Sequence, residues 1–231
     1  MYCPVDGIEV TENFLTHDQC DTLRNGINKL ITRKKDKSYI FAILGPVSQI
    51  NKLTKTCPFV REYLAKVLCK ESNYFYFNIN YFTTNNMPPS EPHVNEAIPA
   101  VLSENGLHDI AQRYNTPEYV NTFYLDVPDD ITNSNLIFDV NGEHYNVTPK
   151  DNLHIRFDGQ YEHWASEFKY DKDRDIVRCT LVVDEVQMSW RDYLQARKLQ
   201  YVDHFVEFDN DNITELELNP SDEDSTLINN K

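Results

Sequence analysis

Between residues 73 and 186 the chain is divided into short runs of alternating apolar and polar residues. The runs at 74–82, 122–127, 135–140, 153–157 and 176–186 are rich in the aromatic and β-branched residues that fit a pleated sheet. Turn-forming residues separate them, including Pro128-Asp129-Asp130, Asn141-Gly142 and Asp158-Gly159. Many short strands with turn signals between them are typical of an antiparallel sandwich or jelly roll. We therefore expect a mostly β protein.

The residues on either side of this region have a helical pattern. Thr16 and Gln19 form a capping sequence, and apolar residues then recur at helical spacing as far as Ile31. Further helices are expected at 58–69 and 189–201. The chain is long enough for one well-buried core. We expect one domain over 1–208, with helices at about 16–70, a β core at about 73–188 and a helix at about 189–201. An acidic, flexible tail is expected over 209–231.

Composition and missing motifs argue against several classes of partner and reaction. The net charge of −15 disfavours nucleic acid or an anionic membrane surface as a partner, since both select for clustered Lys and Arg. The sequence contains neither a membrane-spanning apolar run nor a secretory signal. Its five cysteines have no CxxC spacing, which favours a reducing, cytoplasmic setting. Nucleotide and acyl-transfer chemistries lose support because the Gly-rich phosphate loop and the Gly-x-Ser-x-Gly elbow are missing.

One segment carries candidate metal ligands. In Pro92-His93-Val94-Asn95-Glu96, His93 and Asn95 would project from one face of a strand, roughly 6 to 7 Å apart. His163 is the candidate for a second imidazole. Two imidazoles and one oxygen donor form the facial arrangement that non-haem iron oxygenases use. An aromatic strand at 74–82 would place Tyr76, Asn78 and Asn80 toward a pocket, and its Phe residues toward the helices.

In this order, the segments resemble the 2-oxoglutarate and Fe(II)-dependent dioxygenase superfamily, in particular its prolyl-4-hydroxylase-like branch, over roughly residues 8–188. The resemblance implies flanking helices and a double-stranded β-helix (jelly-roll, cupin-like) core. It rests on the helix entry at 12–20, the Pro-His-x-Asp-Glu-like segment at 92–96, the core strand at 122–128, Phe157-Asp158-Gly159 before the distal histidine, and Arg178-Cys179-Thr180 in the last core strand.

The resemblance also implies roles for individual residues. His93, Asn95 and His163 would bind Fe(II), while Arg178 and Thr180, on one face of their strand, would bind the distal carboxylate of 2-oxoglutarate. Arg174 is a competitor for the role of Arg178. Tyr81 could hydrogen-bond the cosubstrate or simply belong to the core.

The implied reaction uses Fe(II), 2-oxoglutarate and O2 to hydroxylate a C–H bond of an amino acid, a peptide or a small molecule. Succinate and CO2 would be the co-products.

Asn95 departs from the family pattern, because an amide offers a neutral oxygen where the family has a carboxylate. Three readings stay open. Asn95 is a weak ligand, or Glu96 or another carboxylate substitutes for it, or the domain no longer oxidises a substrate and acts as a binding or scaffold module. Glu96 would need a bulge or a break in the strand to reach the metal. Halogenation is disfavoured, since Asn is bulkier than the small residue that halogenating relatives use.

Overall fold

The computed structural model describes residues 6–31, 38–82, 86–87, 90–129, 131–169 and 178–208. The predicted tail at 209–231 therefore lies outside the described residues. The helical elements are α1 (His17–Ile31), η1 (Val47–Gln49), α2 (Ile50–Leu53), η2 (Pro58–Val60), α3 (Arg61–Val67), α4 (Ala97–Glu104), α5 (His108–Arg113) and α6 (Trp190–Ala196).

Antiparallel strands make up most of the fold, in three sheets. The large sheet has the order β1-β9-β5-β12-β3-β2-β13, and the two smaller ones are β10-β7-β8 and β4-β11-β6. The bounds are β1 (Ile8–Glu12), β2 (Ser38–Pro46), β3 (Tyr74–Phe82), β4 (Asn86–Met87), β5 (Tyr119–Asp126), β6 (Thr132–Asn133), β7 (Leu136–Val140), β8 (Glu143–Val147), β9 (Leu153–Asp158), β10 (Glu162–Ala165), β11 (Phe168–Lys169), β12 (Arg178–Val186) and β13 (Tyr201–Phe208).

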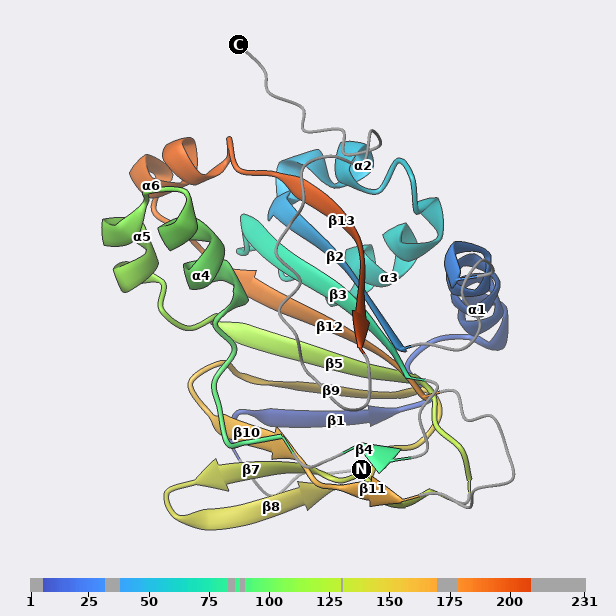
Figure 1. The fold of residues 1–231 in the computed structure, drawn as a ribbon. Coiled ribbons are helices and arrows are strands. Elements are labelled where there is room, and N and C mark those ends of the chain that lie inside the picture. The colour runs from blue at the N-terminus through green and yellow to red at the C-terminus, as the bar shows by residue number, and fades with distance from the viewer. Residues whose placement is uncertain are drawn as a thin grey trace.

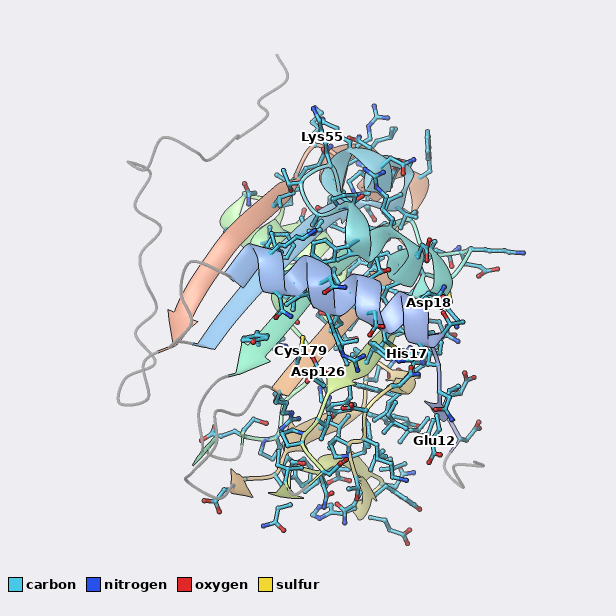
Figure 2. The ribbon with its side chains drawn as sticks, turned by 90° about the vertical axis from the view of Figure 1, so that its right-hand side faces the viewer. Glu12, His17, Asp18, Lys55, Asp126 and Cys179 are labelled. Carbon is cyan, nitrogen blue, oxygen red and sulfur yellow. The ribbon has the colours of Figure 1, made fainter. Side chains whose placement is uncertain are left out.

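Helices α1, α2 and α3 lie over one face of the large sheet, and the small sheets lie beyond its β1 edge (Figure 1). Figure 2 looks onto the helical side, with α1 crossing in front of the strands. A large apolar cluster fills the space between these helices and the sheet. A second cluster joins the large sheet to β7, and a third lies under α4, α5 and α6. The architecture is thus mostly β with flanking helices, as the alternating pattern predicted.

Capping and turn chemistry place several elements where the sequence indicated them. At the start of α1, the Thr16 hydroxyl accepts the Gln19 backbone N–H, and the Gln19 side chain accepts the Thr16 N–H. Between β7 and β8, Asn141 and Gly142 both have left-handed φ angles, as a two-residue hairpin of type I′ requires. The chain entering α1 is fixed by Asn152, whose amide exchanges two hydrogen bonds with the Leu15 backbone.

Two expectations about helices need correction. The helix expected at 189–201 ends at Ala196, and the chain then forms β13, which pairs with the edge of β2. This strand depends on a partner far away in the sequence, which the local pattern does not reveal. The helix expected at 58–69 is divided into η2 and α3. Within the described residues, no helix is both long and apolar enough to cross a membrane.

Candidate active site

A cavity of about 700 Å³ opens on the face of the large sheet opposite α1 and α3. Residues of β3, β5 and β12 line one side, and β10 and the segment leading into α4 line the other. Strand alternation explains the division of β12. Cys179, Leu181 and Val183 belong to the core under the helices, while the cavity receives Arg178, Thr180, Val182 and Asp184.

The cavity contains two histidines that come from separate elements. His93 and His163 form an isolated antiparallel bridge, with backbone hydrogen bonds of 3.1 and 2.9 Å in the two directions. Their rings are 4.7 Å apart between centroids. The structure thus brings together the two imidazoles that the sequence predicted, although about seventy residues separate them.

Backbone carbonyls fix the tautomer of both rings. Nδ1 of His93 lies 2.7 Å from the Glu91 carbonyl oxygen, and Nδ1 of His163 lies 3.0 Å from that of Tyr161. Because a carbonyl only accepts, each Nδ1 carries a proton, and the lone pair of the neutral form of each ring is on Nε2. Burial lowers the pKa of His163 to about 4, partly offset by the hydrogen bond to Tyr161, so this imidazole is neutral at physiological pH. A metal ion binds an imidazole in this state.

Asn95 also lines the cavity, but it lies on irregular backbone and not on the strand that was expected to carry it together with His93. His93 takes part in a single bridge rather than a strand, and residues 94–96 are irregular up to the start of α4 at Ala97. The extended backbone thus breaks after His93, which is the condition under which Glu96 was expected to reach the site. Asn95 and Glu96 both line the cavity, because the chain leaves the extended conformation before α4 begins at Ala97.

Asp184 is the partner of Asn95. The Asn95 Nδ2 group donates to Asp184 Oδ1 over 2.6 Å, joining the segment before α4 to β12. Asp184 is only 2% exposed. Burial raises its pKa to about 7, and the hydrogen bond from Asn95 acts in the opposite direction. A nearby cation would favour the ionised carboxylate.

Arg178 and Thr180 line the cavity at the start of β12, away from Asp184. Along the extended strand, Asp184 is about 20 Å from Arg178. The Arg178 guanidinium is 5.5 Å from the centre of the Tyr124 ring. Burial raises the pKa of Tyr124, and the adjacent guanidinium opposes that rise. Thr180 is 6% exposed, and its hydroxyl has no hydrogen-bond partner within the described residues. A buried cation beside an unsatisfied hydroxyl is suited to a carboxylate ligand.

The structure does not bring Tyr81 to this site. Tyr76, Asn78 and Asn80 line the cavity, as expected from strand alternation, whereas Tyr81 packs with Phe77 and Ile79 against the core under the helices. The suggestion that Tyr81 contacts a cosubstrate is therefore wrong, because odd-numbered residues of β3 face the helices. Arg174, the competitor of Arg178, lies outside the described residues.

Sequence reasoning missed two cavity residues, Asp184 and Tyr124. Both stand at alternating positions in predicted strands, so their shared face with Arg178 and Thr180 was a usable signal. Asp184 lies at an even spacing from Arg178 on one strand, and Tyr124 pairs with Thr180 across two strands. The decisive contact of Asp184 with Asn95 spans 89 positions, which no local pattern can show.

The donor set fits a divalent ion of the iron type only if Asn95 is included. Among the residues that the structure describes, no group of three or more His, Cys, Asp or Glu side chains is placed to hold a metal. The two imidazoles do fit, since each has Nδ1 committed to a carbonyl and Nε2 available. The third donor would be the Asn95 carbonyl oxygen.

Comparison with known proteins identifies the fold. No protein-family model matches the sequence, and no curated protein matches it. The solved structure of IDO from Bacillus thuringiensis is similar to this one with a TM-score of 0.50 at 9% identity, and the match covers 79% of this chain and 94% of that one. A Pseudomonas putida prolyl-4-hydroxylase has a TM-score of 0.47 at 11% identity, and the match covers 79% of this chain and 94% of that one. A Burkholderia pseudomallei 2OG-Fe(II) oxygenase family protein has a TM-score of 0.47 at 11% identity, and the match covers 79% of this chain and 85% of that one.

The chain has a jelly-roll fold with flanking helices, similar to that of the Bacillus thuringiensis protein. At 9% identity the likeness concerns the fold alone, so any statement about activity must come from the residues in the cavity. In this jelly roll the cavity lies on the sheet face away from α1 and α3, and His93, His163 and Arg178 all line it.

Proposed function

We propose that this protein is a non-haem Fe(II)- and 2-oxoglutarate-dependent dioxygenase that hydroxylates a C–H bond of an amino acid, a peptide or a small molecule. In this proposal His93, His163 and Asn95 hold the metal. The observation that carries it is the bridged histidine pair, whose Nδ1 atoms are both committed to backbone carbonyls. Such carbonyl partners orient imidazoles for metal binding.

Arg178, Thr180 and Tyr124 would bind the distal carboxylate of 2-oxoglutarate. The guanidinium supplies the positive charge, and the unpartnered Thr180 hydroxyl can donate to an anionic oxygen. Burial of both side chains keeps water away from this contact, which strengthens it. When bound, Fe(II) with 2-oxoglutarate and O2 would supply the oxidising chemistry, with succinate and CO2 as co-products. The residues of the cavity would bind the cosubstrate and position the C–H bond.

A second candidate is a binding or scaffold module with the same fold. Asn95 favours it, since a neutral amide binds a hard cation less well than a carboxylate does. In that case the cavity would retain affinity for an organic acid at Arg178 but would not support oxidation.

Anaerobic titration of the apo-protein with Fe(II) and 2-oxoglutarate tests both candidates. The proposed site should give the weak visible charge-transfer band of a chelated iron complex. His163→Ala should abolish the band, because it removes one imidazole from the site. His144→Ala is a matched control, since His144 is an exposed side chain on β8 and should leave the band unchanged. If the wild type gives no band at millimolar iron but still binds 2-oxoglutarate, the binding module is favoured.

A further inference from the structure

The contact between Asn95 and Asp184 joins a candidate metal ligand to a buried acid. Its length of 2.6 Å is short even for hydrogen bonds with an ionised partner. The two residues belong to elements that meet only in the folded protein, the segment before α4 and strand β12. On the cavity face, the cross-strand neighbours of Asp184 are Tyr76 and Val120, neither of which carries a positive charge.

Among the described residues, no cation forms an ion pair with the Asp184 carboxylate, and the hydrogen bond that it accepts from Asn95 comes from a neutral amide. Burying a carboxylate without a positive partner is costly. Since the carboxylate lines the cavity, a bound cation would compensate it.

The same contact determines how the Asn95 amide is oriented. The Asn95 nitrogen donates to Asp184 and therefore faces it, and an ionised Asp184 can only accept. The carbonyl oxygen Oδ1 then lies on the other side of the amide, where it can act as a ligand. An anionic acceptor also polarises the amide and increases the negative charge on its oxygen. A neutral amide that is hydrogen-bonded in this way resembles a carboxylate more closely than a free amide does.

We propose that Asp184 supplies, through Asn95, the negative charge that the amide at position 95 lacks in the metal site. Asp184 is then a positioning and charge-compensating residue, and it explains how a His-Asn-His donor set can hold a divalent ion. With Asp184 included, the two imidazoles, the amide and one carboxylate carry the same total charge as two imidazoles and a directly bound aspartate. This inference rests on the proposed function, because it takes His93, Asn95 and His163 as the metal ligands.

The test measures binding of Mn(II) alone to the apo-protein, from the electron paramagnetic resonance signal of the free ion. Asp184→Asn keeps the size of the side chain and an acceptor for Asn95, but removes the charge. It should weaken Mn(II) binding about 10- to 100-fold, the usual range for partners behind metal ligands. Glu185→Gln is the matched control. It removes a buried carboxylate from the next position of β12, which faces the helices and accepts from Asn121 and Cys69. It should leave Mn(II) affinity unchanged.

The exchanged variant Asn95→Asp/Asp184→Asn separates charge compensation from a purely structural contact. It keeps one carboxylate and one amide in the pair, so its Mn(II) affinity should lie within about tenfold of wild type, whereas Asp184→Asn alone should not. This comparison also applies if Asp184→Asn unfolds easily, since the double variant retains both side-chain types. Thermal unfolding of each apo-variant checks the fold.

Three outcomes are decisive. Equal Mn(II) affinity of Asp184→Asn and wild type would overturn the inference and leave the proposed function standing. An exchanged variant that binds more than tenfold tighter than wild type would also overturn it, because Asn95 would then be an uncompensated ligand. Absence of Mn(II) binding by the wild type would overturn the inference and the proposed function together.

Discussion

His154 is a buried histidine that the candidate site does not use. It stacks on Phe14 with ring centroids 4.0 Å apart, and its Nε2 lies 3.2 Å from Asn121 Oδ1. Burial, with smaller contributions from Arg156 and Lys66, lowers its pKa from 6.5 to about 4. The folded protein therefore holds this ring in its neutral form.

We expect His154 to make the apo-protein less stable in mild acid. Between its unfolded pKa of 6.5 and its folded pKa of about 4, the unfolded chain takes up a proton that the folded protein does not. Stability from this group is complete above pH 6.5 and is lost as the pH falls, at about 1.4 kcal/mol per unit at most. Urea unfolding should show that the free energy of unfolding falls from pH 7 to pH 5 by about 2 kcal/mol more in the wild type than in His154→Gln.

Replacement of an exposed histidine provides the control. His17 is largely exposed at the start of α1, and His17→Gln should retain the wild-type difference between the two pH values. An unchanged pH dependence in His154→Gln would show that the ring accepts a proton in the folded state.

At the scale of elements, α1 approaches the rest of the helical layer closely at Gly26. A Cβ atom at this position would lie 2.2 Å from the nearest atom of the Phe59 ring, so the two elements are in contact without room for a methyl group. Arg24, two residues earlier and so about half a turn away, anchors the same helix to the end of β5 through Asp126 at 2.6 Å and the Leu125 carbonyl at 2.9 Å. The position of α1 is thus fixed on both sides.

Gly26→Ala should destabilise the protein, although alanine is ordinarily the better helix former by up to about 1 kcal/mol. The added methyl group must displace the Phe59 ring, and overpacking of this kind costs about 1–3 kcal/mol. Urea unfolding measures the loss. Adding Phe59→Leu should recover part of it, whereas Asn25→Ala, at the exposed neighbouring position, should be neutral or slightly stabilising. A stabilising Gly26→Ala would mean that α1 moves freely away from Phe59.

At the scale of the whole molecule, the two ends of the cavity should contribute separately to ligand-linked stability. The proposed metal ligands lie on β10 and the segment before α4, and Arg178 lies on β12. Ligands that bind only the folded state raise the melting temperature.

Mn(II) at about 100 times its Kd should add about 2.7 kcal/mol, equivalent to about 5–10 °C for a chain of this size. With Mn(II) present, 2-oxoglutarate should give a further increase. Arg178→Met should remove only this second increase, because it leaves the imidazoles in place. Thermal scanning of the apo-protein and the loaded protein checks this, with exposed Arg191→Met as the control. If Arg178→Met also lost the increase in melting temperature caused by Mn(II), the two ends of the cavity would not contribute separately.

The sequence by itself determined the elements with strong local patterns. The Thr16 and Gln19 caps, the Asn141-Gly142 turn and the alternation in β3 and β12 depend on neighbouring residues, so they were predictable. The same alternation correctly placed Arg178 and Thr180 on one face. It also contained the information that Tyr81 faces the helices.

Only the tertiary structure decided the rest, because the deciding contacts connect residues that lie far apart in the chain. β13 forms because it pairs with β2. The extended backbone ends before α4 begins at Ala97, so both Asn95 and Glu96 line the cavity. The contact between Asn95 and Asp184 forms when the segment before α4 lies against β12. A local pattern identifies which side chains share a face, but which faces meet is determined by packing of the complete chain.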